Sequence, residues 1–386
     1  MTNIAIESLQ LNRFRSYTGA RLVTGGASVA LYGPNGAGKT NVLEALSLLV
    51  PGRGLRRAAS EELMRRPDPV GWRLRAEVTQ AEGLVEVVTG AEAGASGRMV
   101  EIDGKAATQS ALGHLIRMVW LTPAMDRLWL DGAAERRRFL DRIALGFFPA
   151  HGEASIRYEK VMRERNRLLK DGPGDPSWLG GLEAQMGREG ARIARARALA
   201  LARLEAAQNQ AETLFPRAEM AILGYMEARF AEVIRSAGAD SEELDALESE
   251  EAAGLCAALG VGRVRDAAAG RSLTGPHRSD LEAIYAVKSM PARACSTGEQ
   301  KALLISLILA NARALAEAGT VPVVLLDEVA AHLDAERRAA LYAEIHGLGC
   351  QAWMTGTGPE LFEALPPETR RFSVTETPDG SALEAA

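Results

Sequence analysis

The stretch Gly33-Pro34-Asn35-Gly36-Ala37-Gly38-Lys39-Thr40 decides the fold of the chain. It follows a compact apolar run at residues 29–32, typical of a buried strand, and precedes a helix that we expect over residues 39–49. Its glycines let the backbone wrap a phosphate without Cβ clashes, and the N–H groups of a helix start favour an anion. The pattern predicts a phosphate-binding loop, in which Lys39 reaches the β- and γ-phosphates of a nucleotide and the Thr40 hydroxyl helps to hold Mg²⁺.

A second apolar run, at residues 323–326, ends in two acids, Asp327 and Glu328. A buried parallel strand places such carboxylates at the carboxyl edge of its sheet, beside a phosphate loop. We expect Asp327 to bind Mg²⁺ through water and Glu328 to orient or activate the attacking water. Acidic pairs after a strand are also common as solvated helix caps, but the phosphate loop favours the functional interpretation. The candidate catalytic residues are Lys39, Asp327 and Glu328, and the candidate Mg²⁺ ligands are Thr40 and Asp327.

Between these motifs lies Cys295-Ser296-Thr297-Gly298-Glu299-Gln300-Lys301, followed by a strongly helical stretch. Ser296 with Glu299 three residues later also fits a helix capping box. The segment lies roughly thirty residues before the acidic strand end, and in sequence and position it resembles the signature of ABC ATPases. In that superfamily the signature contacts the γ-phosphate bound by a second subunit. The resemblance implies a homodimer that holds two ATP molecules head to tail. The candidate ATP-binding residues are Gly33, Pro34, Asn35, Gly36, Ala37, Gly38, Lys39, Thr40, Ser296, Gly298, Gln300 and Asp334.

Two further segments resemble sequence elements of ABC ATPases, and each differs from the usual pattern at one position. Asp334, in Ala331-His332-Leu333-Asp334, matches the D-loop that spans such a dimer interface. His332 stands where an acidic or small residue is common, and a surface residue at a helix start is its plain interpretation. The switch position, Met354-Thr355-Gly356-Thr357, contains no His, but a threonine there could still hydrogen-bond the γ-phosphate.

The composition, with 47% hydrophobic and 25% charged residues, is that of a globular protein, and 386 residues suggest two lobes or one domain with an insertion. The net charge of −5 counts mildly against nucleic acid, but arginine-rich stretches alternate with an acidic run at residues 240–251. Three separated cysteines form no zinc or disulfide pattern, and no apolar run approaches the roughly 20 residues that span a bilayer. We expect a cytoplasmic protein with no signal peptide and no membrane partner.

The order of these patterns predicts an α/β fold, a P-loop ABC-type ATPase head with a mixed and parallel sheet, split by a helical, arm-like second domain. Residues 1–134 would form the N-terminal part of the head, residues 135–262 the arm, and residues 263–386 the C-terminal part. Alternation over residues 71–103 predicts antiparallel strands with one solvated face. Within the arm we expect a hairpin of two long helices, over residues 182–214 and 217–236, separated at Pro216.

Five segments, in order along nearly the whole chain, resemble the RecF family. They are LQLNRFRSY at 9–17, GPNGAGKTNVLEA at 33–45, ERRRFLD at 135–141, a stretch from Tyr158 that ends in RNRLLK at 165–170, and TGPHRSDL at 274–281. The resemblance implies ATP-dependent DNA binding at single-strand gaps, single/double-strand junctions and arrested forks. It also implies a slow, DNA-stimulated ATPase that works with RecO and RecR to help load RecA. Glu328 departs from the second Asp of many relatives.

Two other functions stay open at this point, a transporter-coupled ABC motor and a nucleotide-regulated scaffold with negligible hydrolysis. A transporter subunit normally carries a Gln in its Q-loop, and the corresponding residues 120–123 contain none. The intact pair Asp327 and Glu328 argues against the scaffold.

Candidate DNA contacts are arginines, because binding to the DNA backbone requires cations on one face. Arg188, Arg192 and Arg195 share a helical face by their spacing, although each such cluster could equally be a solvated face paired with Glu. Without an aromatic ladder for single-stranded bases, sequence-neutral binding to duplex DNA is the better hypothesis. The other clusters are Arg136, Arg137 and Arg138, and Arg53, Arg56 and Arg57; Arg15 could contact a nucleotide phosphate, and His277 and Arg278 could support the dimer.

Overall fold

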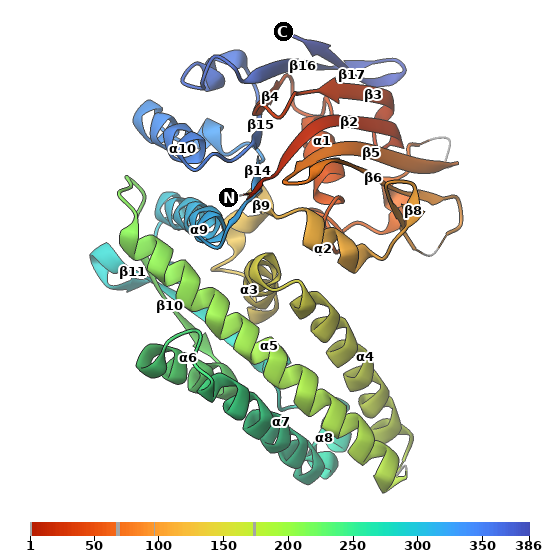
Figure 1. The fold of residues 1–386 in the computed structure, drawn as a ribbon, viewed down its shortest axis with the longest axis vertical. Coiled ribbons are helices and arrows are strands. Elements are labelled where there is room, and N and C mark those ends of the chain that lie inside the picture. Colours follow the sequence, from red (N-terminus) through yellow and green to blue (C-terminus); the bar gives the residue numbers. More distant parts are fainter. Residues whose placement is uncertain (1, 67–69, 96, 173–174) are drawn as a thin grey trace. The chain divides into compact units, whose positions relative to one another are not determined.

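The computed structural model describes residues 2–66, 70–95, 97–172 and 175–386. Its strands and helices form two compact units (Figure 1). The first unit comprises Met1–Asp126, Ala211–Pro216 and Leu304–Ala386, and the second comprises Arg127–Gln210 and Arg217–Leu303. The first unit is therefore assembled from segments at both ends of the sequence.

A six-stranded sheet in the order β17-β16-β4-β15-β14-β9 forms the centre of the first unit. The five strands β16, β4, β15, β14 and β9 are parallel to one another, whereas β17 pairs antiparallel with β16. The residues of β14 and β15 are buried throughout, as expected where both faces of a parallel sheet are covered. The strands are Val29–Tyr32 (β4), Met118–Leu121 (β9), Val323–Leu326 (β14), Ala352–Gly356 (β15), Arg370–Thr377 (β16) and Gly380–Ala385 (β17).

An antiparallel sheet in the order β3-β2-β5-β6-β7-β8 belongs to the same unit. Along β5 the side chains alternate, so that Trp72 and Leu74 are buried while Arg73 and Arg75 are exposed. Helix α1 (Lys39–Ser47) contributes to one apolar core together with residues of both sheets. This packing fixes α1 and the loop before it. The strands are Ala5–Phe14 (β2), Tyr17–Val23 (β3), Gly71–Gln80 (β5), Gly83–Glu92 (β6), Met99–Ile102 (β7) and Lys105–Ala106 (β8).

Short elements complete this unit. β1 (Thr2–Asn3) pairs with β13 (Thr320–Val321), α2 spans Leu112–Leu115, and α10 spans Ala335–Gly347. Helix α9 (Thr297–Glu317) begins in the second unit and continues into the first. The strands expected at residues 29–32, 71–103 and 323–326 are confirmed, as is the helix expected to begin at Lys39. Among the described residues, no helix is both long and apolar enough to cross a membrane.

The second unit is mainly helical. The helices α5 and α7 pack with α4 and α6 around a core that includes Tyr158, Met186 and Phe230. Beside them lies a small sheet in the order β10-β11-β12. The elements are α3 (Ala133–Phe147), α4 (Ala150–Asp171), α5 (Pro176–Gln210), β10 (Ala218–Leu223), α6 (Tyr225–Ala237), α7 (Glu243–Val261), α8 (Arg263–Ala269), β11 (Asp280–Tyr285) and β12 (Met290–Pro291).

The helix expected over residues 217–236 was wrong in its first part. Residues 218–223 form strand β10, which pairs antiparallel with β11, and the helix α6 begins only at Tyr225. Gly224, in an extended conformation, separates the two. The apolar positions Met220 and Leu223 fit a helical spacing, but pairing with a strand some 60 residues later in the chain, which local spacing does not reveal, decides the conformation. The expected helical hairpin is therefore a helix, a strand and a second helix.

The units also divide the chain differently from the expected boundaries after residues 134 and 262. Residues 263–303 belong to the helical unit, and they include the signature-like segment at residues 295–301. Strand pairing of β11 with β10 and the bidentate ion pair of Arg136 with Asp280, at 2.8 and 2.9 Å, attach this segment there.

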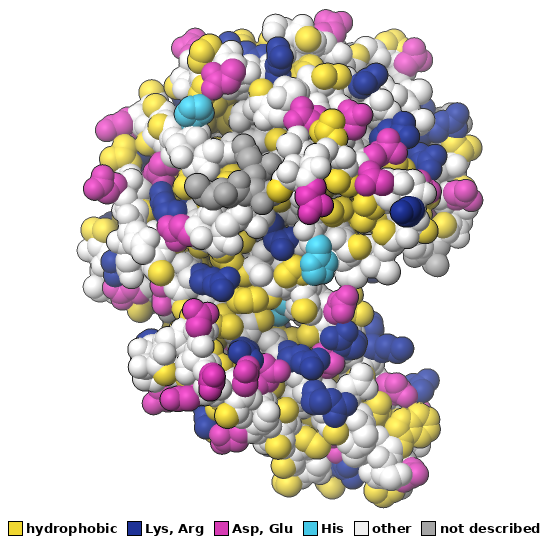
Figure 2. Space-filling view, in the orientation of Figure 1, with side chains coloured by type: hydrophobic (Ala, Val, Ile, Leu, Met, Phe, Trp, Pro, Cys, Tyr) yellow, Lys and Arg dark blue, Asp and Glu magenta, His cyan; other side chains and the backbone are white. Residues whose placement is uncertain are grey.

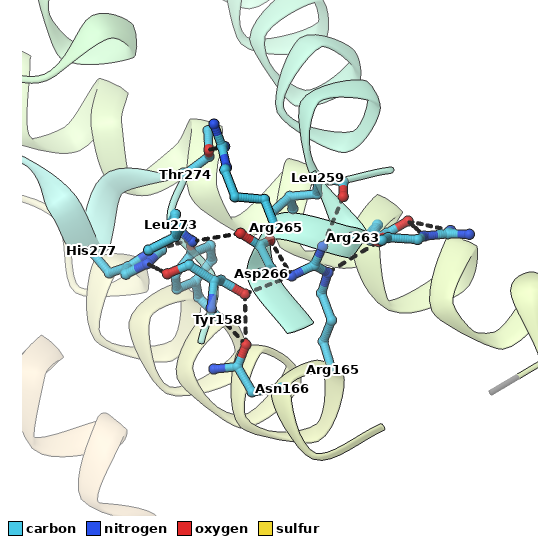
Figure 3. A network of polar contacts seen from close by, with 12 residues as sticks. Tyr158, Arg165, Asn166, Leu259, Arg263, Arg265, Asp266, Leu273, Thr274 and His277 are labelled. Atoms are coloured by element: carbon cyan, nitrogen blue, oxygen red, sulfur yellow. Dashed lines mark hydrogen bonds and ion pairs between the residues drawn. The ribbon is translucent and has the colours of Figure 1, made fainter. Parts of the chain in front are cut away.

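A buried arginine connects four elements of the helical unit (Figure 3). Arg165 of α4, with 0% exposure, donates to Glu183 of α5 at 3.0 Å and to Asp266 of α8 at 2.8 Å. It also donates to the Leu259 carbonyl at the end of α7 and to the Ser272 hydroxyl, both at 2.8 Å. Every guanidinium nitrogen is therefore used, which is the condition under which a buried charge is tolerated.

The same network fixes the segment that leads to β11. Asn166 accepts from the backbone N–H of Ser272 at 2.9 Å, and Tyr158 hydrogen-bonds His277 Nδ1 at 2.8 Å. His277 Nε2 lies 3.0 Å from the Ser272 carbonyl, which can only accept, so Nε2 carries the proton and Nδ1 accepts from Tyr158. Burial lowers the pKa of His277, in keeping with this neutral form.

Replacing Arg165→Met is expected to destabilise the helical unit by about 3–5 kcal/mol, because Asp266 keeps a buried charge without its partner. The measurement is thermal unfolding together with amide hydrogen exchange in residues 150–280. The control is the exposed neighbour Arg167→Met, which should change stability by less than about 0.5 kcal/mol. Equal stability of the two variants would contradict the central role of Arg165.

Candidate nucleotide-binding site

The phosphate-loop motif lies at the carboxyl end of β4, at the start of α1. Residues Pro34 to Gly36 are exposed at its crest, whereas Lys39 is only 3% exposed. Gly38 has a φ of 110°, and a Cβ atom there would lie 2.3 Å from Ser381 Oγ, so this turn requires glycine. The backbone of the loop thus presents N–H groups beside the start of a helix, the arrangement suited to a phosphate.

The Lys39 ammonium lies within the loop. Its Nζ donates to the carbonyls of Gly33 at 2.7 Å and Pro34 at 2.8 Å. Burial lowers its pKa, and the nearby carboxylates of Glu328 and Asp327 oppose that effect. The charge of Lys39 is therefore directed at the space that the loop encloses and lies near two acids.

The strand order brings the two predicted motifs together. β4 and β14 both pair with β15, one on each side, and all three are parallel, so their carboxyl ends meet at one edge of the sheet. Asp327 follows β14 at this edge. The Thr40 hydroxyl donates to Asp327 Oδ1 at 2.8 Å. The structure thus places the predicted Mg²⁺ ligands within hydrogen-bond distance of one another.

Thr355 on the intervening strand β15 completes this contact. Its hydroxyl donates to Asp327 Oδ1 at 2.8 Å and accepts from the Glu328 N–H at 2.9 Å. Burial raises the pKa of Asp327, and hydrogen bonds from Thr40 and Thr355 act against that rise. The threonine of the predicted switch segment therefore orients both acids at the end of β14.

Glu328 has a strained backbone, with a φ of 55°. For a residue with a Cβ atom this left-handed conformation costs on the order of 1–3 kcal/mol, and it persists only where neighbours impose it. Here the bond from its N–H to Thr355 fixes the geometry. Its side chain is partly exposed, unlike that of Asp327, so its carboxylate can reach solvent at the site.

The signature-like segment lies in the helical unit. Ser296 and Glu299 form the reciprocal capping box, since the Ser296 N–H and hydroxyl donate to Glu299 at 2.8 and 2.9 Å and the Glu299 N–H donates back at 3.4 Å. Lys288 and then Ser296 lower the pKa of Glu299 to about 2. Gly298 has open space where a side chain would be. Gln300 is buried, and its Nε2 donates to the Cys295 carbonyl at 3.0 Å, which holds the loop in shape.

Of the other predicted residues, two are exposed beside α10 and one forms an ion pair with a buried acid. Asp334 caps α10 by accepting from the Arg337 N–H at 2.8 Å, with its side chain 61% exposed. His332 is exposed in a short turn before that helix. Arg15 forms a bidentate ion pair with the fully buried Glu44, at 2.9 and 2.7 Å, rather than extending toward the phosphate loop.

Several DNA candidates are engaged within the molecule. Arg195 pairs with Asp245 and Glu248 of α7, and Arg192 pairs with Glu189 and Glu248. Arg136 binds Asp280, Arg137 donates to the Ser279 carbonyl, and Arg138 pairs with Glu135. Arg56 bonds Asn41 and Glu44. The acidic run at residues 240–251 thus neutralises part of the arginine face of α5.

A row of cations on α4 was missed by the sequence analysis. Lys160, Arg163, Arg167 and Lys170 are exposed and recur at intervals of three and four residues, so they share one face of the helix. Among the described residues none of them forms an ion pair. The helical spacing was readable from the sequence, but the absence of acidic partners was not. We call this set the α4 row.

The chain matches a known protein family over most of its length. The model of the RecF/RecN/SMC N-terminal domain family matches residues 5–377. The DNA replication and repair protein RecF of Brucella suis biovar 1 is 47% identical over 378 residues, which cover 96% of this chain and 95% of that protein. The RecF of Rhizobium rhizogenes is 46% identical, with coverage of 96% and 97%. The chain therefore belongs to the RecF family.

Two solved structures have the same fold as this chain. The recombination mediator protein RecF-ATP of the RecFOR pathway superposes with a TM-score of 0.81 at 22% identity, over 100% of both chains. The Smc head domain of Pyrococcus furiosus, with an extended coiled coil, superposes with a TM-score of 0.51 at 16% identity, over 100% of this chain and 96% of that one. The ABC-type ATPase fold expected from the motifs is confirmed.

Proposed function

We propose that this chain is an ATP-dependent DNA-binding protein of recombinational repair, which closes on DNA as an ATP-bound homodimer and opens on slow hydrolysis. The observation that carries the proposal is the contact of Thr40 and Thr355 with Asp327 at the end of the parallel sheet. It joins the phosphate loop to the acidic strand end, the minimal machinery for phosphoryl transfer to water. The family membership and the ATP form of a structural relative support the same function.

In this function Lys39 and the backbone of residues 33–40 bind the phosphates of ATP. Hard oxygen donors suit Mg²⁺, and the Thr40 hydroxyl and Asp327 carboxylate, already 2.8 Å apart, would hold it. When bound, Mg²⁺ would neutralise part of the negative charge of the phosphates. Glu328 orients the attacking water and accepts its proton, with its backbone fixed by Thr355.

The dimer requires a second copy of the chain. Ser296 and Gly298 at the start of α9 would contact the γ-phosphate bound by the other copy, where the helix N-terminus favours an anion. The capping box keeps that helix start in place, and the open space beside Gly298 leaves its backbone accessible. Gln300 supports the loop from within, and Asp334 lies on an exposed surface suited to the interface.

DNA binding is assigned to the α4 row, Lys160, Arg163, Arg167 and Lys170. Because α4 rises about 1.5 Å per residue, the row extends over about 15 Å, which suits several phosphates of a duplex. Glu159 and Glu164 stand three or four residues from members of the row, but no cation of the row forms an ion pair among the described residues. Figure 2 shows Lys and Arg side chains over the part of the helical unit where α4 lies, with Asp and Glu side chains among them. A backbone contact of this kind is sequence-neutral.

The biological setting follows from the family. We propose that the chain acts in the cytoplasm at gaps, single/double-strand junctions or arrested forks. There it would work with RecO and RecR toward the loading of RecA, with an ATPase that DNA stimulates. The RecFOR pathway named for the structural relative supports these partners.

Removing the Thr355 hydroxyl by Thr355→Val is expected to lower the turnover of ATP about tenfold while ATP affinity changes less than threefold. The change leaves the Glu328 N–H without its acceptor, and an unsatisfied buried donor costs about 1–3 kcal/mol. We expect this cost to disturb the orientation of Asp327 and Glu328. Steady-state hydrolysis and nucleotide binding measure the two quantities. Thr357→Val, at an exposed position on the same segment, is the control. Unchanged turnover in Thr355→Val would refute the role.

The α4 row is tested by replacing all four of its cations with Gln. Duplex affinity in the presence of ATP should fall at least tenfold, and the slope of log affinity against log salt should become shallower by about 3 to 4, because each phosphate contact contributes about 0.9. Fluorescence anisotropy over a salt series provides both values.

The matched control for the α4 row is the pair Arg192→Gln and Arg195→Gln, whose side chains already have acidic partners. Its affinity and salt slope should stay near those of the unaltered chain. If the control weakens DNA binding more than the row variant, the DNA surface lies on α5.

A further inference from the structure

The C-terminal hairpin, strands β16 and β17, packs against both ends of the phosphate loop. β16 pairs in parallel with β4, the strand that leads into the loop, and the two lie side by side in Figure 1. A Cβ atom at Gly33 would lie 2.1 Å from the Val374 carbonyl oxygen. One at Gly38 would lie 2.3 Å from Ser381 Oγ. The hairpin therefore contacts the loop where it leaves the sheet and again where α1 begins.

The hydroxyl of Ser16 joins this hairpin to the first turn of α1. Its oxygen accepts hydrogen bonds from Ser381 Oγ and from Asn41 Nδ2, both at 2.7 Å. The orientation of the Asn41 amide is fixed, because its Oδ1 accepts at 2.9 Å from Arg56, which can only donate. Asn41 directly follows Thr40, the predicted Mg²⁺ ligand. A single hydroxyl thus connects the hairpin to the helix that carries the site.

The next residue, Tyr17, holds the loop itself. Its hydroxyl donates to the Gly38 carbonyl at 3.1 Å. Tyr17 is completely buried, and burial raises the pKa of its phenol, so the hydroxyl keeps the proton that it donates. Two consecutive side chains, those of Ser16 and Tyr17, therefore fix two positions of the phosphate loop and of α1.

The turn of the hairpin gives Ser381 a defined position. The Ser381 N–H donates to the Ser16 carbonyl at 2.9 Å, and the Thr18 hydroxyl donates to the Asp379 carbonyl at 2.9 Å. Gly380 has a φ of 111°, and a Cβ atom there would lie 2.1 Å from the Ser16 carbonyl oxygen. The turn therefore requires glycine at this position. Backbone and side-chain contacts together hold the Ser381 hydroxyl against the loop.

The phosphate loop depends on such contacts from outside. Gly33, Gly36 and Gly38 have φ values between 85° and 148°, and glycine leaves the backbone more conformational freedom than any other residue. The crest of the loop, at residues 34–36, is exposed. A loop that binds phosphate through its N–H groups loses affinity if it must first be ordered, because ordering costs entropy. Contacts that fix the loop in advance therefore raise its affinity for a nucleotide.

We infer that Ser381 and Ser16 are positioning residues of the nucleotide site, which hold the phosphate loop and Asn41 in the binding conformation before a nucleotide enters. They act through the loop and through Asn41, and neither hydroxyl needs to touch the nucleotide. The inference rests on the proposed function in one respect, that ATP is the ligand of the loop. Since the loop binds phosphates that ATP and ADP share, the two hydroxyls support the affinity for both.

The experiment titrates the full chain with mant-ATP and mant-ADP in the presence of Mg²⁺ and without DNA, and measures steady-state hydrolysis alongside. Ser381→Ala and Ser16→Ala should each raise the Kd for both nucleotides and the KM for ATP about three- to tenfold, while kcat changes less than twofold. The double variant should be no weaker than the weaker-binding single one, because the two hydroxyls act as a unit.

The matched control is Ser373→Ala on β16, whose hydroxyl forms no hydrogen bond among the described residues. It should bind both nucleotides as the unaltered chain does, and circular dichroism checks the fold of each variant. Amide protons of residues 379–383 should exchange more slowly when ATP is added to the unaltered chain, but not when it is added to Lys39→Ala.

Three results would overturn the inference. They are an unchanged Kd in both Ser381→Ala and Ser16→Ala, an equal loss of affinity in Ser373→Ala, and a fall in kcat as large as the rise in KM. Because nucleotide binding is measured on the chain without DNA, an unchanged Kd in the two variants overturns this inference and leaves the proposed function standing. An unaltered chain that binds no nucleotide would overturn both.

Discussion

The parallel pairing of β15 with both β4 and β14 is the constraint on which the candidate site depends. It brings two segments almost three hundred residues apart in sequence to one edge of a sheet. Asp327 then accepts hydrogen bonds from Thr40 on one side and Thr355 on the other. Shifting β15 by one residue against its neighbours would turn the Thr355 hydroxyl away from Asp327, because side chains alternate along a strand. The buried apolar side chains of the strands, such as Leu325 and Trp353, hold this register.

The helical unit depends on a different kind of interaction, a buried charge with a complete set of partners. Arg165 joins α4, α5, α7 and α8, and its neighbours hold the segment that leads to β11. From β11 the chain continues to the capping box of Ser296 and Glu299. Polar contacts with defined geometry thus attach the segment that precedes β11 and the signature-like loop to the helices.

The sequence was sufficient where short-range chemistry decides the structure. The glycine-rich loop predicted α1 and the acids predicted the end of β14, because strand, turn and helix signals coincide within a few residues. It failed at residues 218–223, where pairing with a distant strand outweighs a helical spacing. A threonine of residues 354–357 was expected to be able to hydrogen-bond the γ-phosphate, and the contact of Thr355 with both acids depends on strand order that local patterns do not reveal. Arginine spacing likewise identified the helical face that contains Arg195 but not its acidic partners, and the α4 row was not identified from the sequence.

We propose that ATP closes two copies of this chain on DNA. The most direct measurement is sedimentation of the purified chain with duplex DNA, with and without ATP and Mg²⁺, for the unaltered protein and for Glu328→Gln and Lys39→Arg. We predict a monomer without ATP and a DNA-bound dimer with it, persistent in Glu328→Gln because hydrolysis is blocked, and absent in Lys39→Arg. A chain that stays monomeric with ATP, or that binds DNA equally well without it, would show that ATP does not close two copies on DNA.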